Sequence, residues 1–240
     1  LFKKHTLFSM PEKKKTIQVT SSGTSGNASQ IRFEWSGLSI AFFSIFYQVM
    51  KRKLISIIPC HYIMLGYKPH KSNHAVISKT AYATSFMAPS LKKTYALTIK
   101  NGKYEVELDE IIKALSRAGK SHFPTRIIGF SSYAFFMMKK MEESGMKIKL
   151  PHGSKLLLGG GWKQFYTEKV EKEVLYEMAE RLLGIKEDQI VEFFGAVEHP
   201  VIYCDCSHHH FHVPNSSHVI IRDPQTLKPL SYGQVGLVNL

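Results

Sequence analysis

Short apolar segments with the composition of strands alternate along this chain with segments whose apolar residues recur at helical spacing. Residues 126–130, 155–158 and 190–194 are brief apolar runs that polar or glycine-rich loops follow, which is typical of buried strands. Between them, residues 133–144 and 168–183 carry apolar side chains every three or four positions and are followed by a glycine. This alternation predicts an α/β fold with a mostly parallel sheet that is flanked by helices.

The rest of the chain extends the same pattern. Asn101-Gly102 between two strand-like runs is a strong hairpin signal, because both residues tolerate the positive φ of a tight turn. Asp109 is a natural N-cap for the helix that follows, and Gly119 is a natural stop. We expect further strands at residues 15–19, 54–58, 94–99 and 103–108, helices at 33–51 and 109–118, partial helix in 70–87, and a late strand-rich segment at 218–222 and 234–240.

The 32 Lys and Arg residues against 19 Asp and Glu residues give a formal net charge of +13, which raises the question of nucleic-acid binding. The basic clusters are short and scattered, as at residues 13–15, 51–53 and 139–140. No zinc-finger spacing, RNA-binding strand motif or continuous basic helix accompanies them. We therefore expect no nucleic-acid partner, and interpret the charge as a solvated surface that suits ATP and an acidic protein.

The composition sets the class of protein. A length of 240 residues with 44% hydrophobic residues suits a large folded domain and excludes a disordered chain. Three cysteines argue against a disulfide framework and predict a reducing, cytoplasmic setting. The most apolar runs, 38–50 and 54–64, are shorter than the roughly 18 residues of a membrane span. The N-terminus does not resemble a signal peptide, and both ends read as if sequence continues beyond them, so we expect a fragment.

The first of three informative loops follows the strand expected at residues 15–19. It consists of Ser21, Ser22, Gly23, Thr24, Ser25 and Gly26. Glycines let the backbone approach a ligand closely, while exposed N–H groups and hydroxyls bind phosphate oxygens. The spacing of a P-loop is missing, so a flexible connection is the alternative to a phosphate site.

The other two loops also follow expected strands. Gly159, Gly160 and Gly161 form a flat slot for a planar base, at the strand end where ligands collect in open α/β sheets. Glu198 closes the sequence FGAVE at 194–198, where a carboxylate can hold Mg²⁺ on a triphosphate. The alternatives are a tight turn for the glycines and an exposed loop acid for the glutamate.

These loops, in this order, resemble those of the adenylate-forming enzymes, which activate carboxylates with ATP. That superfamily has a phosphate loop of the type TSGTTG, a glycine-rich adenine-binding turn and an aromatic-Gly-x-x-Glu motif, and the GQVGL at 233–237 is similar to its G-E-x-G-x-L turn. The stretches LPHGSKLLLGGGWK, FFGAVEHP, FHVPNSSHVIIRDPQTLKPL and GQVGLVNL resemble the LuxE family of acyl-protein synthetases over essentially the whole chain. The resemblance implies that residues 1–240 form the N-terminal, large adenylation domain, incomplete at both ends and without the small C-terminal domain.

The resemblance implies roles for the matching residues. Ser22 to Gly26 would hold the β- and γ-phosphates, Gly160 and Gly161 would line the adenine pocket, Phe194 beside Gly195 would stack on the base, and Glu198 would hold Mg²⁺.

Two departures from the superfamily pattern affect the candidate catalytic set. Ser29 stands in place of a basic residue, and Val197 stands in place of a threonine that would donate a hydrogen bond to the adenylate phosphate. Lys163 and His199 are candidates to supply the missing positive charge. The predicted catalytic residues are therefore Glu198, Thr24, Lys163 and His199.

The resemblance also implies the reaction. A fatty-acid carboxylate attacks the α-phosphorus of ATP, pyrophosphate leaves, and the acyl group passes from the adenylate to a protein cysteine, forming a carbon–sulfur bond. That cysteine would lie beyond Leu240, and a partner acyl reductase would accept the acyl group. Two alternatives stay open: an acyl- or aryl-CoA ligase of the phenylacetate–CoA ligase type, and a non-catalytic nucleotide- or zinc-binding module.

Cys204, Cys206, His210 and His212 have the residue types of a zinc site, although their C-x-C spacing is cramped. Cys60 follows Pro59 in an apolar stretch and is expected to pack as a small hydrophobe.

The aromatic residues at helical spacing are expected mainly in the core, with an acyl channel as the alternative. They are Phe42, Phe43, Phe46, Phe130, Tyr133, Phe135 and Phe136. The turn at 129–132 is the better candidate for a pocket, because it follows a strand.

Overall fold

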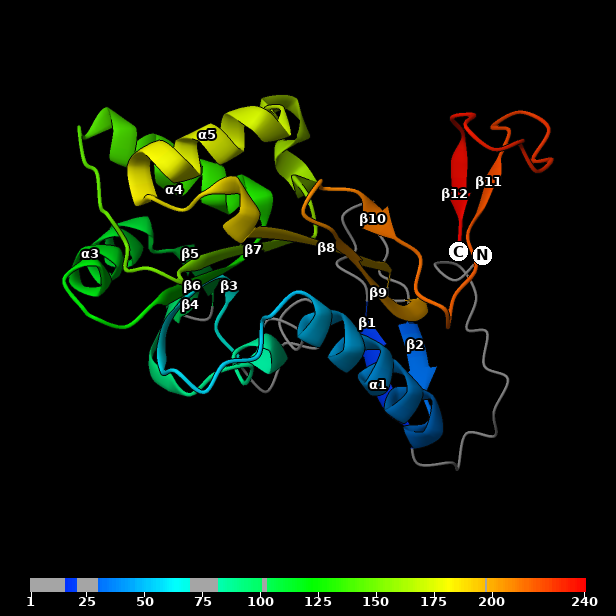
Figure 1. Ribbon diagram of the computed structural model, residues 1–240, viewed down its shortest axis with the longest axis horizontal. Helices are drawn as coiled ribbons and strands as arrows, with labels where there is room; N and C mark the ends of the chain where they lie inside the picture. The colour runs from blue at the N-terminus through cyan, green and yellow to red at the C-terminus, as the bar shows by residue number, and fades with distance from the viewer. Residues whose placement is uncertain (1–15, 21–29, 70–81, 101–102, 197) are drawn as a thin grey trace.

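The computed structural model describes residues 16–20, 30–69, 82–100, 103–196 and 198–240. Within these residues the centre of the molecule is an eight-stranded sheet with the strand order β10-β9-β8-β7-β6-β3-β4-β5 (Figure 1). Its strands are β3 (Cys60–Tyr67), β4 (Ser90–Lys100), β5 (Lys103–Val106), β6 (Thr125–Gly129), β7 (Lys155–Gly159), β8 (Ile190–Ala196), β9 (His199–Asp205) and β10 (Phe211–His212). Two further pairs, β1 (Ile17–Thr20) with β2 (Gln30–Phe33) and β11 (Ile220–Arg222) with β12 (Leu237–Asn239), form small antiparallel sheets.

The middle of the large sheet is parallel and both of its sides are antiparallel. Strands β4, β3, β6, β7 and β8 are parallel neighbours, whereas β5 pairs antiparallel with β4, and β9 and β10 continue antiparallel from β8. The predicted α/β fold with a mostly parallel sheet and a late strand-rich segment is confirmed.

Helices cover the two faces of the sheet unequally. In Figure 1, α3 (Leu108–Gly119), α4 (Ser131–Glu143) and α5 (Lys172–Leu183) lie on one face, and α1 (Trp35–Lys51) lies on the other, against β9. Two short 3₁₀ helices, η1 (Lys163–Glu168) and η2 (Glu187–Gln189), flank α5. The larger core lies under the three helices, where Ile127 and Leu156 of the sheet and Met137 of α4 are fully buried.

The strand expected at 54–58 is wrong, because the strand begins later, at Cys60. Leu54 is buried, but Ile57 is 91% exposed and the segment has no strand partner within the described residues. Pro59 lacks an N–H for a strand ladder, and the apolar run after it pairs with both β4 and β6. Cys60 itself is buried, as predicted. It belongs to a second core, which includes Val49 of α1, Leu54 and Leu157 of β7.

The hairpin between β4 and β5 is confirmed by the pairing of Lys100 with Lys103, although its turn residues 101–102 lie outside the described residues. The predicted N-cap of α3 is wrong: Glu107 is the capping position, and Asp109 lies in the first turn with Lys140 at 2.7 Å. A carboxylate there still favours the helix through its dipole. Most of the segment at 70–87 lies outside the described residues.

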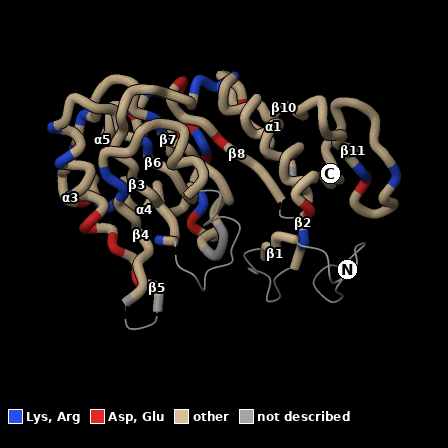
Figure 2. The backbone as a smooth tube through the Cα atoms, turned by 90° about the horizontal axis from the view of Figure 1, so that it is seen from below, with Lys and Arg blue, Asp and Glu red and all other residues tan. Residues whose placement is uncertain are grey.

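The aromatic residues of α1 are exposed, contrary to the expectation of a core. Phe42, Phe43 and Phe46 are 62%, 69% and 45% exposed, and their rings contact one another. The helix buries only Ala41, Gln48 and Val49, because it meets the sheet along one narrow side. In the described part of the chain, no helix has the length and apolar character needed to cross a membrane. Figure 2 shows Lys and Arg scattered along the backbone rather than gathered in a stripe.

Candidate functional site

The carboxyl ends of β6, β7 and β8 lie side by side at one edge of the sheet. The strand register pairs Gly129 with Leu158 and Gly159 with Phe193. The loops that leave these strands therefore start from adjacent positions, at the edge where open α/β sheets bind ligands. The structure thus brings together two of the three predicted loops, and adds the turn at 129–132 as a third neighbour.

The glycine turn after β7 adopts backbone conformations that favour glycine. Gly160 and Gly161 have φ angles of 76° and 64°, and a Cβ on Gly161 would meet nothing within 4 Å. The conformation, not crowding, therefore requires glycine here. Trp162 is buried beside Phe135 and anchors the turn, with ring centroids 5.4 Å apart. Lys163 opens η1, but its side chain lies outside the described part of the structure.

Phe194 and Glu198 lie at the end of β8. The Phe194 side chain is 46% exposed, and its ring meets Tyr203 and Phe211 at centroid distances of 6.0 and 6.4 Å. Part of the ring is therefore free to contact a planar ligand. Gly195 follows on the same strand, and Glu198 is exposed in the turn that leads to β9.

His199 is held by two hydroxyl groups next to Glu198. Its Nε2 atom lies 3.1 Å from the Tyr203 hydroxyl and 3.1 Å from Ser217 Oγ, and those two oxygens are 2.6 Å apart. Tyr203 is buried, so the imidazole has a fixed position. Sequence reasoning found His199 but missed its partners. The spacing of Tyr203, on the same face of β9, was a usable signal, whereas Ser217 comes from a distant loop.

The turn after β6 contributes a glycine under close contact and a buried hydroxyl. Gly129 has a φ of 155°, and a Cβ there would lie 2.2 Å from the carbonyl oxygen of Leu65. Ser132, in the first turn of α4, is buried, and its hydroxyl makes no hydrogen bond to any described residue. This turn was predicted as a pocket candidate, and it lies beside the end of β7.

The phosphate-loop prediction falls on residues that the structure does not describe. Ser21, Ser22, Gly23, Thr24, Ser25, Gly26 and Ser29 all lie in the undescribed segment 21–29. The two strands that flank it are described, and they pair antiparallel with Thr20 opposite Gln30. The loop therefore connects two hydrogen-bonded strands, and its role stays a prediction.

The predicted zinc ligands are not brought together as a set, although Cys206 and His212 contact each other. Cys204 packs in the second core, whereas Cys206 lies past the end of β9 in a turn with His210, and His212 lies on β10. Among the described residues, no three His, Cys, Asp or Glu side chains are arranged to hold a metal ion. The buried Asp205 between the cysteines instead binds His209 Nδ1 at 2.6 Å and Arg52 at 3.5 Å.

The two neighbouring thiols differ in acidity. Burial, together with the Asp205 carboxylate, raises the pKa of Cys204 to about 12. A hydrogen bond with the His212 side chain, helped by the N–H groups of His208 and His210, lowers the pKa of Cys206 to about 7. Cys206 is thus the more reactive thiol of the two, since the thiolate is the nucleophile.

We expect iodoacetamide to alkylate Cys206 and to spare Cys204 and Cys60, which are both buried. Since the pKa of Cys206 is lowered, its alkylation rate should rise with pH to a midpoint near 7 and then level off. Peptide mass spectrometry across a pH series measures this. In a His212→Phe variant the midpoint should move up toward about 8.5, the value of a free cysteine. Labelling of Cys204 first, or a midpoint already near 8.5, would contradict this account.

In a comparison with known protein families, one family model matches the whole chain. The family model "Acyl-protein synthetase, LuxE" matches residues 1–240. A long-chain-fatty-acid–luciferin-component ligase of Aliivibrio fischeri is 24% identical over 143 residues, which are 59% of this chain and 37% of the relative. The ligase of the same name from Vibrio harveyi is 23% identical over 136 residues, or 56% of this chain and 36% of the relative. The match therefore spans just over a third of the length of these curated relatives.

Solved structures with a similar fold share little sequence. McyG A-PCP complexed with phenylalanyl-adenylate superposes with a TM-score of 0.54 at 13% identity, covering 98% of this chain and 35% of that one. The amide bond synthetase McbA from Marinactinospora thermotolerans gives 0.51 at 14% identity, with coverage of 96% and 43%. Apo MatB from Rhodopseudomonas palustris gives 0.50 at 14%, with coverage of 92% and 38%. At these identities the likeness is one of fold, and it confirms the predicted α/β fold class.

Proposed function

The chain belongs to the LuxE acyl-protein synthetase family, and on that premise we propose that it carries the nucleotide-binding part of an ATP-dependent, AMP-forming ligase. The substrate is a fatty acid, which is activated as an acyl adenylate and passed to a protein thiol. The observation that best supports this is the adjacency of the strand ends at Gly129, Gly159 and Phe193, from which the three loops leave. We further propose that residues 1–240 are the large adenylation domain of a longer enzyme.

The residues at this edge suit a nucleotide. The glycine turn after β7 presents backbone to the base, and the exposed part of the Phe194 ring provides a stacking surface. The amino end of α4 and the unpartnered hydroxyl of Ser132 are donors for an anionic group at the same edge. Ser21 to Gly26 remain our candidates for the β- and γ-phosphates.

Glu198 is the candidate ligand for Mg²⁺. A single exposed carboxylate fits this ion, which keeps several waters and takes its other ligands from substrate phosphates. When bound, Mg²⁺ supplies charge stabilisation to the phosphate oxygens. His199 lies next to Glu198, and its ring is positioned by Tyr203 and Ser217 to place an N–H donor or a positive charge beside them. Lys163 is the second candidate for that charge.

The acyl group of the adenylate needs an acceptor. We favour a protein cysteine, with a partner acyl reductase or another protein receiving the acyl group, because the curated relatives are ligases that act on a luciferin component. The three cysteines are all free thiols, which suits a cytoplasmic location. Transfer of the acyl group to coenzyme A is the alternative, and its product is an acyl-CoA instead of an acylated protein.

Pyrophosphate exchange with a panel of carboxylic acids tests the proposal on the full-length protein. We expect long-chain fatty acids to support ATP–pyrophosphate exchange, because adenylate formation is reversible, and short acids to support it weakly. Incubation with labelled fatty acid and ATP should then label a protein band that hydroxylamine cleaves. Formation of acyl-CoA instead would favour the alternative. If ATP binds and no acid supports exchange, the ligase proposal is wrong.

A further inference from the structure

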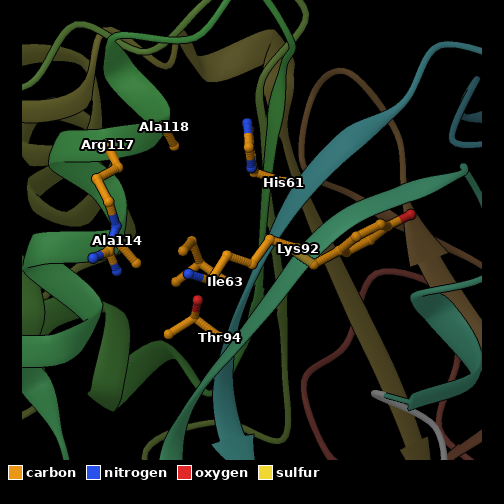
Figure 3. A pocket seen from close by; sticks show the side chains of 8 residues that line it. His61, Ile63, Lys92, Thr94, Ala114, Arg117 and Ala118 are labelled. Carbon is orange, nitrogen blue, oxygen red and sulfur yellow. The ribbon is translucent and has the colours of Figure 1, made fainter.

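A basic cavity lies at the opposite end of the parallel strands from the candidate nucleotide site. It has a volume of about 170 Å³ and lies between the start of β3, the first half of β4 and the last turns of α3 (Figure 3). It is lined by His61, Tyr62, Ile63, Lys92, Thr94, Ala114, Arg117 and Ala118. His61 is the second residue of β3, so the cavity is at the amino end of that strand, whereas the candidate nucleotide site is at the carboxyl ends of β6, β7 and β8.

The face of the sheet that packs under the helices becomes polar at this cavity. Side chains alternate between the two faces of a strand, and Ile63, Leu65 and Ala96 occupy the face that is buried under the helices. The preceding positions on that face are His61 on β3, and Lys92 and Thr94 on β4. Toward the cavity this face therefore changes from buried apolar residues to the half-buried His61 and Thr94 and the exposed Lys92.

The opposing helix leaves room for these side chains and adds a further cation. Ala114 and Ala118 are the small residues that face the strands, and Arg117 stands between them at the rim. In Figure 3 the Lys92 side chain extends from β4 toward Arg117 and Ala114. The side chains that line the cavity include no acid, and neither Lys92 nor Arg117 forms an ion pair with any described carboxylate.

Two of the basic groups lie directly beside each other. The strand register pairs His61 with Lys92, an arrangement that is unfavourable when both are charged. Burial, with a smaller contribution from Lys92, holds the pKa of His61 below its usual value, so the imidazole is largely neutral at pH 7. A hydrogen-bonding contact of 3.1 Å between His61 Nε2 and Ser121 Oγ fixes the ring. A bound anion beside Lys92 would offset the influence of that lysine and favour the protonated imidazole.

We propose that this cavity is a binding site for a small phosphate-bearing anion, held by Lys92 and Arg117 with the Thr94 hydroxyl and the His61 ring. Its volume of about 170 Å³ has room for one or two phosphoryl groups. Two cations with no acid among the lining side chains favour a dianion over a monocarboxylate. The site does not depend on the proposed ligase activity.

Calorimetric titration of the full chain with inorganic phosphate at constant ionic strength tests the proposal, with pyrophosphate and acetate as parallel arms. We expect phosphate or pyrophosphate to bind, and acetate to bind at least tenfold more weakly. Lys92→Met and Arg117→Met should each weaken binding about tenfold or more. Lys113→Met is the matched control, because Lys113 lies on α3 but pairs with Glu110 at 2.9 Å on the exposed surface.

The ring of His61 gives a second readout that a nonspecific charge effect would not move. Phosphate should raise the pKa of His61, as followed by NMR of its ring protons, because an anion beside Lys92 stabilises the protonated imidazole. Phosphate should leave the NMR chemical shifts of the His152 ring protons unchanged, because His152 is exposed and lies outside the cavity. The proposal is overturned if acetate binds as well as phosphate, if Lys113→Met weakens binding as much as Lys92→Met, or if the pKa of His61 does not respond. None of these outcomes depends on ATP or fatty acid, so they leave the ligase proposal untouched.

Discussion

Replacing Gly129 with alanine is expected to lower the free energy of unfolding by about 4 kcal/mol, which is a large part of the stability of a typical domain. The new Cβ would lie 2.2 Å from the carbonyl oxygen of Leu65 and 2.7 Å from its Cβ, on the neighbouring strand β3. The first contact is with backbone, so no side-chain rotation relieves it. The φ of 155° adds strain, since residues with a Cβ rarely adopt it. Urea unfolding followed by circular dichroism measures the loss.

Gly37→Ala is the matched control. Gly37 lies in α1, and a Cβ there would meet nothing within 4 Å. Alanine at that position should raise the stability by about 0.5–1 kcal/mol, because it restricts the unfolded chain and favours the helix. If the two variants shifted the midpoint equally, the contact between β3 and the turn after β6 would not be the cause.

Glu198→Gln is expected to slow pyrophosphate exchange of the full-length protein about 100-fold or more. The amide keeps the size of the side chain and removes the negative charge that would hold Mg²⁺ beside the phosphates. The Mg²⁺ concentration for half-maximal exchange should rise as well, which separates loss of metal binding from loss of a structural contact. Because Glu198 is exposed in its turn, the unfolding midpoint should not move.

A charge-matched control is Glu143→Gln at the end of α4, where the side chain is exposed and distant from the strand ends along the chain. Its exchange rate should stay within twofold of the parent protein. An exchange rate for Glu198→Gln that is equally unaffected would remove Glu198 from the site, and would leave His199 and Lys163 to be tested next.

The order of elements was predictable because each carries a local signal. Asn101-Gly102 marked the hairpin, glycines marked the ends of α4 and α5, and the runs at 126–130, 155–158 and 190–194 were apolar enough to be buried strands. The strand at 60–67 was misplaced because its apolar run merges with the preceding one across Pro59, and periodicity alone does not locate the break.

The errors at the site have a different cause, because they concern contacts between distant residues. His199 was selected for its place beside Glu198, but its partnership with Ser217 depends on a loop 18 positions away. Cys204 and Cys206 looked equivalent in sequence, yet one faces the core under α1 and the other lies in a turn past the strand. The exposed aromatic side chains of α1 follow helical spacing as a core helix would, and only the narrow contact with β9 shows otherwise.

The antiparallel sides of the large sheet have a consequence for how copies of this protein meet. The five parallel strands lie inside the strand order of the sheet, and the outermost positions fall to β5 and β10, of four and two residues. An outer strand that short offers few free N–H and C=O groups as a template, and β5 also carries Lys103 and Glu105. Strand addition onto β5 or β10 is therefore disfavoured. β5 covers only residues 97–100 of β4, however, so residues 90–96 of β4 carry no strand on their outer side among the described residues.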